Sequence, residues 1–431
     1  SAGCNGDDHG RIIPDIEYFP NMALLGRQLR SSDSNAGLGV YVIPGTFSAD
    51  RDKVILGTNV TLGSTWKEQD ITKHSKFCRM EFDYSRPGVQ EWHNSVVDLL
   101  CDKYSVAYIK LDYMCPTRSP DGCQGFTDSR PAAAMFHTAI ARSKCNGSMR
   151  LGLSWMLDWD RPFWDAWNET ADSMRTDEDI NNSGELDLVR FSTVQRAIER
   201  YRVWVSSLAE GLLSDSPTAP IGIRPDMDNL FVSNPLKLSG LHPAQRQTAA
   251  MMWIGAGANL LEGGDLTQMD ELGEKLLYDP RVHGAGGIVD RFGEHPMQPR
   301  NPKQPLNCPS HWPWRVGGAN PQQLQAWIAG PNAAGDALVI LSNLGPDEYP
   351  RTGPGASGTF MTRCAGNLRV QISYQELGLA VGNSSYATYD VSVVWDGRQT
   401  HRTSGVEAHG TEGLAEELGP WESIMYALTR L

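Results

Sequence analysis

Short apolar runs alternate with amphipathic helical patterns through about residue 300 of the chain. Seven runs are predicted as strands because they are short, rich in apolar residues and followed by turn residues: 38–43, 78–82, 106–112, 150–155, 172–174, 221–223 and 258–261. Apolar positions at helical spacing between them predict helices over 87–101, 131–142, 185–208 and 242–254. Repeated strand–helix units of this kind indicate a parallel sheet covered by helices.

The pattern changes after a Pro-rich stretch at 296–314. Five short, alternating segments separated by Gly, Pro, Asp and Asn turns then predict an antiparallel β-sandwich: 326–328, 337–342, 370–373, 391–395 and 423–428. We expect an α/β fold in which a (β/α)8 barrel domain, residues 1–317, precedes a sandwich domain, residues 318–431. Seven strands are one fewer than this barrel requires, so its first βα unit is expected to precede Ser1.

The segment 106–112, Val-Ala-Tyr-Ile-Lys-Leu-Asp, is the most informative in the chain. Its apolar residues predict a strand of a parallel sheet. Lys110 and Asp112 stand at its C-terminal end, where an α/β barrel gathers its catalytic groups. Because unpaired buried charge is expensive, these two residues indicate a site, or alternatively a structural ion pair that closes the strand.

Polar and aromatic residues follow most of the other predicted strands as well: Asp83, Trp155, Asp158, Arg175, Asp177, Asp179, Arg224, Asp226 and Asp228. Carboxylates and tryptophan, without a Cys/His nucleophile pair or a phosphate-binding glycine loop, favour carbohydrate chemistry. Glycoside hydrolysis needs one anionic and one protonated carboxyl group. Asp112 beside Lys110 suits the anionic role, and Asp179 beside Asp177 and Glu178 suits the protonated one, because like charges raise a pKa. Alternatively, 177–179 forms a solvated acidic cap on the following helix.

Composition narrows the class of protein. A net charge of −13 argues against nucleic-acid binding and fits an uncharged substrate. No apolar run approaches the roughly 20 residues that cross a bilayer, so no membrane partner is expected. The sequence shows no C-x-x-C or H-E-x-x-H spacing, so neither a metal nor a cofactor is expected.

Eight cysteines and several N-x-S/T sequons indicate a secreted, glycosylated protein. The candidate glycosylation sites are Asn59, Asn146, Asn168 and Asn383, and a fifth sequon begins at Asn181. Eight cysteines allow 105 full pairings. Cys115 and Cys123, which flank a Pro/Gly/Asp loop, are the most plausible local pair.

Four segments resemble glycoside hydrolase family 27, and in particular its fungal secreted α-galactosidase-like branch: YIKLD (108–112), ADSMRTDEDINN (171–182), RPDMDNLFVSNP (224–235) and WIGAGANLLEGGDLTQMDELGEKLL (253–277). The likeness runs nearly end to end. It implies a retaining mechanism with Asp112 as nucleophile and Asp179 as acid/base. It also implies that Lys110, Arg175 and Asp226 hold sugar hydroxyls and that Met227 lies beside the sugar.

Two departures from the family pattern affect the expected site. The Asp-rich end of the family's first strand would precede Ser1, so an upstream segment of the same gene product is expected to complete the barrel. Ser154-Trp155-Met156 stands where galactosidases usually carry Glu or Asn, which leaves the sugar open. Trp155 is expected to stack on a sugar face, or else to be a core aromatic that caps the strand.

The leading hypothesis is a secreted exo-acting α-galactosidase whose partner is an oligosaccharide or polysaccharide ending in a galactose-like sugar. Its alternatives are a β-L-arabinopyranosidase, an isomaltose-releasing dextranase, and a non-catalytic sugar-binding protein on the same scaffold. A purely structural extracellular protein would leave the charged strand ends unexplained.

Overall fold

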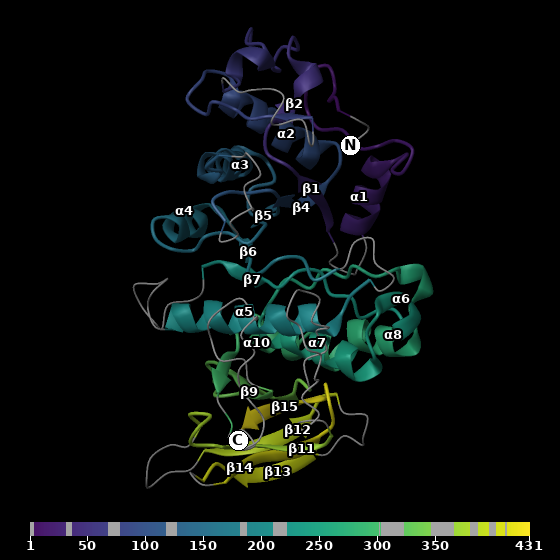
Figure 1. Ribbon diagram of the computed structural model, residues 1–431, viewed down its shortest axis with the longest axis vertical. Helices are drawn as coiled ribbons and strands as arrows, with labels where there is room; N and C mark the ends of the chain where they lie inside the picture. Colours follow the sequence, from purple (N-terminus) through teal and green to yellow (C-terminus); the bar gives the residue numbers. More distant parts are fainter. Residues whose placement is uncertain are drawn as a thin grey trace, which may run out of the picture. The chain divides into compact units, whose positions relative to one another are not determined.

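The structure is a computed structural model of the 431-residue chain. It describes residues 4–31, 37–67, 78–117, 127–181, 188–209, 222–300, 302, 323–345, 366–379, 387–395, 402–409 and 412–431. The chain forms two compact units, Ser1–Arg175 and Thr176–Leu431 (Figure 1). The domain boundary expected near residue 318 lies outside the described residues. Among the helices that are described, none has the length and apolar character needed to cross a membrane.

The first unit is built on four parallel strands in the order β1 (Leu38–Val42), β4 (Val106–Leu111), β5 (Arg150–Leu153) and β6 (Ser173–Arg175). Helices α2 (Val89–Asp102), α3 (Arg130–Arg142) and α4 (Phe163–Thr170) fill the connections (Figure 1). Helix α1 (Met22–Ser31) precedes β1. The strands and α2 to α4 confirm the expected strand–helix alternation. The upstream segment expected to pair with β1 stays a prediction.

One expected barrel strand is wrong. Residues 78–82 contribute β3 (Arg79–Met80), which pairs antiparallel with β2 (Thr46–Phe47) rather than joining the parallel sheet. β1 instead pairs directly with β4. Two short 3-10 turns, η1 (Ser48–Asp50) and η2 (Leu62–Thr65), lie between β2 and β3 in the chain.

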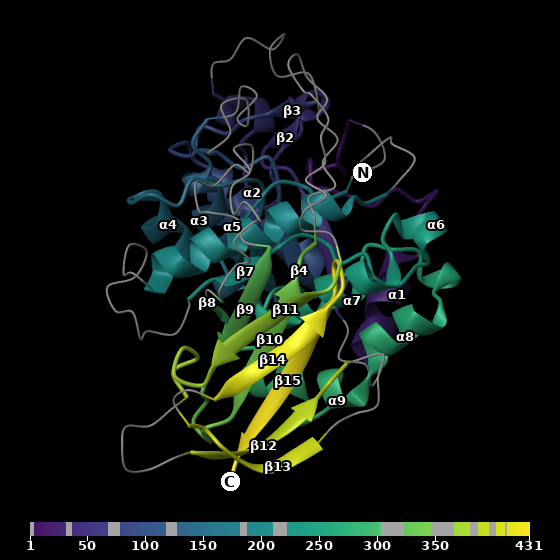
Figure 2. The same ribbon diagram turned by 60° about the horizontal axis from the view of Figure 1, so that its bottom comes forward.

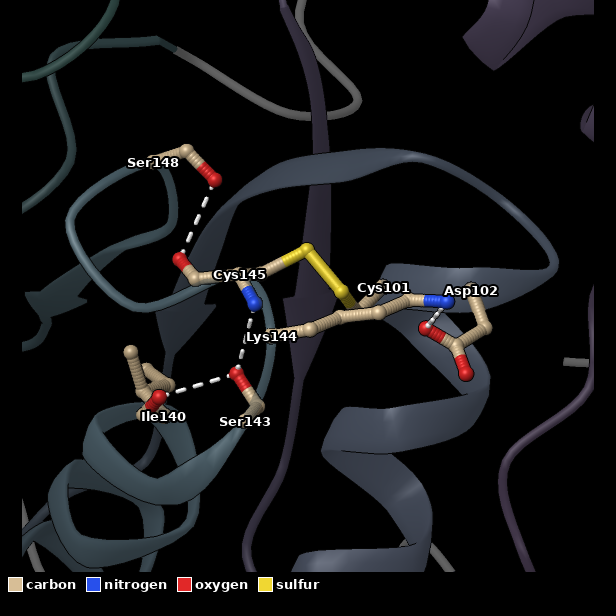
Figure 3. The surroundings of a disulfide bond; sticks show 7 residues. All are labelled: Cys101, Asp102, Ile140, Ser143, Lys144, Cys145 and Ser148. Atoms are coloured by element: carbon tan, nitrogen blue, oxygen red, sulfur yellow. Dashed lines mark hydrogen bonds and ion pairs between the residues drawn. A yellow bond between two sulfur atoms is a disulfide. The ribbon is translucent and has the colours of Figure 1, made fainter.

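Two disulfides are described in this unit, Cys4–Cys78 and Cys101–Cys145. The second joins the last turn of α2 to the turn between α3 and β5 (Figure 3). Ser143 supports that turn, because its hydroxyl accepts a hydrogen bond from the Cys145 N–H and donates one to the Ile140 carbonyl. Cys115 is also disulfide-bonded, whereas its expected partner Cys123 lies outside the described residues.

The second unit starts with α5 (Phe191–Ala209) and β7 (Arg224–Asp226). Five further helices and a 3-10 turn follow: α6 (Leu236–Ser239), α7 (Pro243–Gly255), η4 (Leu266–Gln268), α8 (Glu271–Tyr278), α9 (Pro280–His283) and α10 (Ile288–Phe292). The expected strand at 258–261 forms no regular strand. It still runs parallel to the chain after β7, because Asn259 N–H bonds to Pro225 O and Leu230 N–H bonds to Leu261 O. The helix expected over 185–208 begins at Phe191.

The antiparallel domain expected after the barrel is confirmed. Six strands form one sheet in the order β13 (Arg402–Glu407), β12 (Thr388–Val393), β15 (Ser423–Arg430), β10 (Ala337–Asn343), β9 (Leu324–Ala329) and β8 (Gln298–Arg300). A second sheet pairs β11 (Leu368–Ser373) with β14 (Gly413–Leu418) (Figure 2). Apolar side chains from both sheets share one buried core. On its other side the large sheet packs against α7 through β9, β10 and β15.

Helix α2 carries a buried histidine in an aromatic cluster. His93 is fully buried, and its ring centroid lies 4.8 Å from that of Phe136 and 5.3 Å from that of Phe82. Its Nδ1–H donates to the Val89 carbonyl at 2.7 Å, while Nε2 is buried without a hydrogen bond to any described residue. Burial therefore lowers the pKa of His93 to about 4, from an ordinary value of 6.5.

This histidine should make the first unit less stable in acid. Between pH 7 and pH 5 the unfolded chain binds a proton at residue 93 and the folded one does not, so the free energy of unfolding should fall by about 2 kcal/mol. Tryptophan-fluorescence melts in denaturant would measure this slope. His93→Phe, which keeps an apolar ring, should reduce the slope by that amount. An unchanged slope in the variant would contradict the assignment.

The Cys101–Cys145 disulfide should stabilise the unit by restricting the unfolded chain. With a sequence separation of 44 residues, chain-entropy arguments give a loss of about 4 kcal/mol for the double variant Cys101→Ala/Cys145→Ala. Thermal and denaturant unfolding would measure it, with mass spectrometry to verify that the remaining disulfides have formed. A loss below about 1 kcal/mol would show that the loop is held by other contacts.

Candidate active site

One face of β4 carries the residues on which the sequence prediction rests. Tyr108, Lys110 and Asp112 share one face because side chains two residues apart point to the same side of a strand. Asp112 directly follows β4, and its N–H donates to the Val42 carbonyl, which continues the ladder with β1. Lys110 and Asp112 are both half-buried.

The parallel register brings the ends of β4, β5 and β6 together. Leu111 pairs with Leu153, and Leu153 pairs with Met174, so the following residues Asp112, Ser154 and Arg175 form the next row. The Ser154 N–H donates to Leu111 O at 2.8 Å, and Arg175 Nη1 lies 3.5 Å from the Ser154 hydroxyl. Ser154 and Arg175 are each 1% exposed, so they form the buried wall beside Asp112.

A glycine in β5, Gly152, makes room for the side chain of Tyr108. The Tyr108 hydroxyl reaches across β5 to the Ser173 hydroxyl, at 3.1 Å. A Cβ atom on Gly152 would lie only 1.8 Å from the Tyr108 hydroxyl oxygen. Glycine at 152 therefore leaves the space that the Tyr108 hydroxyl occupies next to β5.

The two charged groups at the end of β4, Lys110 and Asp112, do not form an ion pair with one another. Asp112 accepts a hydrogen bond from the N–H of Tyr113 at 2.8 Å, and no ion pair within 4.0 Å joins it to Lys110. Among the described residues, the Lys110 ammonium has no hydrogen-bond or ion-pair partner. The alternative of a structural Lys110–Asp112 pair is therefore wrong. Tyr113 has a positive φ of 55°, a strained conformation that is common near functional sites.

Two other residues of this unit, Trp155 and Asp83, were also among the predicted strand-end residues. Trp155 is half-buried, so it is neither a fully enclosed core residue nor free on the surface. Asp83 does not belong to the set of strand ends, because β3 lies outside the parallel sheet. Hydrogen bonds from Ser85 and then Arg86 hold the pKa of Asp83 at about 2. This carboxylate therefore stabilises the local turn that contains these residues.

In the second unit, the segment 176–181 carries the other predicted carboxyl group. Asp177 is 1% exposed, and its carboxylate lies 2.7 Å from Arg196 Nε and 3.5 Å from Arg200 Nε. The alternative of a solvated acidic cap is therefore wrong for Asp177. Because its charge is paired, Asp177 does not act on Asp179 as the isolated like charge that was expected. The Asp179 side chain is exposed.

The turn after β7 is fixed beside that segment. The Asp226 carboxylate accepts the Asp228 N–H at 2.8 Å, and the Asp228 carboxylate accepts the Ile180 N–H at 2.8 Å. Asp228 has a positive φ of 78° and is 4% exposed. Arg224 is used structurally, since it donates to the carbonyls of Gly257 and Gly293.

Arg175, Asp226 and Met227 are each 2% exposed or less. Their predicted contacts with sugar hydroxyls, and the roles of Asp112 and Asp179, stay predictions. Arg196 was not among the site residues predicted from the sequence. Its available signal was the pair Arg196 and Arg200 at helical spacing shortly after an acidic triplet. Among the described residues, no group of three or more His, Cys, Asp or Glu side chains could hold a metal.

The candidate glycosylation sites Asn59, Asn146 and Asn168 are exposed. Asn383 lies outside the described residues. Exposure is necessary for an attached glycan, and these three sites stay predictions.

Comparison with known proteins shows what the chain is related to. A protein of Hypocrea jecorina named α-galactosidase 3 is 34% identical over 412 residues, which cover 96% of this chain and 59% of that protein. The chain is a relative of the fungal α-galactosidases of glycoside hydrolase family 27. This confirms the resemblance predicted from the sequence, although the chain spans less than two thirds of that relative's length. No family model matches the chain.

Solved structures of family 27 share the fold. A β-L-arabinopyranosidase of this family from Geobacillus stearothermophilus superimposes with a TM-score of 0.69 at 17% identity, covering 98% of this chain and 81% of that one. The α-galactosidase of Saccharomyces cerevisiae gives a TM-score of 0.60 at 14% identity, covering 100% and 87%. The α/β fold with a C-terminal antiparallel domain is thus confirmed, and the eight-strand count stays a prediction.

Proposed function

We propose that the chain is a retaining exo-glycosidase that hydrolyses terminal α-D-galactosyl residues. The observation that carries the proposal is the end of β4, where Lys110 and Asp112 lie half-buried on one face of the strand without pairing to one another. Charged groups that do not pair with one another can bind the polar groups of a ligand. The similarity to fungal α-galactosidases supports galactose as the sugar.

The proposed reaction is a double displacement. The Asp112 carboxylate attacks the anomeric carbon and forms a glycosyl ester, while the Asp179 carboxylic acid gives its proton to the departing glycosidic oxygen. Asp179, now a carboxylate, then takes a proton from water as that water attacks the ester. The second step releases the sugar with its configuration retained and restores both groups. This route requires the two carboxyl groups to lie about 5–5.5 Å apart.

Lys110, Arg175 and Asp226 are proposed to hold sugar hydroxyls, with Trp155 and Met227 beside the ring. Arg175 is supported in its position by Ser154 and by the register of β5 and β6.

The proposal includes secretion of the protein. Two disulfides are described and Cys115 is also disulfide-bonded, and such bonds persist mainly in oxidising compartments.

A second candidate is β-L-arabinopyranosidase activity, which the family 27 neighbour from Geobacillus stearothermophilus favours. L-Arabinopyranose matches galactose except for the missing hydroxymethyl group, so one corner of the pocket decides between the two sugars.

A panel of nitrophenyl glycosides tests the substrate. We expect the α-D-galactoside to be hydrolysed with the highest kcat/KM and the β-L-arabinopyranoside more slowly. The reverse order would favour the second candidate. Binding of galactose by calorimetry without turnover of any glycoside would instead identify a non-catalytic sugar-binding protein.

Substitution of the two carboxyl groups tests their roles. Asp112→Asn should lower turnover of every substrate by at least about 10⁴-fold, because both steps need the nucleophile. Asp179→Asn should cost about 10²–10⁴-fold on an alkyl galactoside, but far less on a dinitrophenyl galactoside, whose leaving group needs no proton. Asp98→Asn, at an exposed ion pair with Arg142, is the matched control. Equal losses for both variants on the dinitrophenyl substrate would contradict the assignment.

A further inference from the structure

The backbone that carries Asp179 is held by a side chain from the next helix. Arg196 lies in the second turn of α5, and its guanidinium contacts three successive residues of the segment. Its Nε donates to the Asp177 carboxylate at 2.7 Å. Its Nη2 donates to the carbonyl of Asp179 at 2.8 Å and to that of Glu178 at 3.3 Å.

This arrangement uses the geometry of a guanidinium. The planar group offers N–H donors in fixed directions, so one side chain can bind a carboxylate on one edge and carbonyl oxygens on another. Lysine has a single ammonium and cannot reproduce both edges at once. The contact with Asp177 is also well shielded from water, because that carboxylate is 1% exposed and the Arg196 side chain is 21% exposed.

Arg200 provides a contrast within the same helix. It lies four residues further along and its Nε is 3.5 Å from the same carboxylate. No contact between Arg200 and the Glu178 or Asp179 carbonyl is found among the described residues. Arg200 therefore helps to compensate the charge of Asp177, whereas Arg196 also fixes the backbone at Asp179.

The other side of Asp179 is fixed as well. The Ile180 N–H donates to the Asp228 carboxylate at 2.8 Å, and the Ile180 carbonyl accepts the Thr193 hydroxyl at 2.6 Å. Asp179 thus presents an exposed carboxyl group from a backbone that is bonded at its own carbonyl and at the next residue. An exposed side chain on a fixed backbone is what a proton donor needs to meet a substrate oxygen at a defined position.

We infer that Arg196 is a positioning residue that sets where Asp179 delivers its proton. The inference rests on the proposed function and adds a residue to it. Because Arg196 donates to the carbonyl of Asp179, its loss should displace the acid without removing it. A displacement of about 1 Å is enough to cost about 10²-fold in a step that depends on it.

The test compares the full-length chain with Arg196→Met and Arg196→Lys on two galactosides. On the alkyl galactoside, which needs protonation, Arg196→Met should lower kcat/KM by about 10²-fold. On the dinitrophenyl galactoside, whose leaving group needs no proton, glycosylation should fall by less than about 5-fold, as measured by kcat/KM. Arg196→Lys should lie between the wild type and Arg196→Met on the alkyl substrate, because it keeps the charge beside Asp177 but loses one edge of contacts.

Three controls separate positioning from a loss of structure. Arg142→Met removes an arginine of an exposed ion pair and should match the wild type on both substrates. Arg200→Met removes charge beside Asp177 but leaves the Asp179 carbonyl contact, so its ratio of the two losses should stay near one. Combining Arg196→Met with Asp179→Asn should cost no more on the alkyl galactoside than Asp179→Asn alone, because the displaced acid is then already absent.

Each outcome is decisive. Equal losses on both galactosides for Arg196→Met, or losses that multiply in the double variant, would show a purely structural role and overturn the inference while the galactosidase proposal stands. A wild-type chain that hydrolyses neither galactoside would overturn the proposed function, and the inference with it.

Discussion

The hydrogen-bond register of β4, β5 and β6 is the constraint on which the row of Asp112, Ser154 and Arg175 depends. Asp112, Ser154 and Arg175 come from three separate stretches of chain, and they form one row only because Leu111, Leu153 and Met174 are paired in that order. A slip of one residue in any of these strands would turn its polar side chain to the opposite face. Tight pairing of the strands thus specifies the composition of the site.

Charge compensation plays the corresponding role in the second unit. A carboxylate as buried as Asp177 is costly unless a cation meets it, and Arg196 and Arg200 of α5 provide two. This pairing changes the meaning of the acidic triplet 177–179. One member is an internal anchor and another, Asp179, is left exposed on the anchored backbone. Three neighbouring acidic residues therefore have different environments, which the sequence alone does not distinguish.

The sequence predicted those features that depend on local pattern. Apolar composition located β4 and β5, helical spacing located α2, α3 and α7, and alternation located the antiparallel domain. The prediction failed where a strand or side chain contacts a residue that is distant in the sequence. Residues 78–82 read as a barrel strand, but only the pairing of Arg79 and Met80 with β2 shows that they lie elsewhere. The role of Arg196 was likewise hidden, because a helix face reveals its partner only after folding.

Helix α5 connects the candidate site with the antiparallel domain of the same unit. Arg196 and Arg200 face the segment of Asp179, while Gln195, Glu199 and Arg202 lie on an adjacent stripe of the helix at i, i+4 and i+7 spacing. Gln195 donates to the Leu344 carbonyl, and Glu199 accepts a hydrogen bond from Gln325 of β9. Arg202 lies over the Trp327 ring of the same strand.

These contacts give the antiparallel domain a physical part in the site. A helix is stiff along its length because each turn is bonded to the next. Holding one stripe of α5 against β9 therefore limits how far the adjacent stripe can shift. The guanidinium of Arg196 inherits that restriction, and so does the carbonyl of Asp179 to which it donates. The antiparallel domain therefore acts on the position of the Asp179 carbonyl through α5, which contacts both.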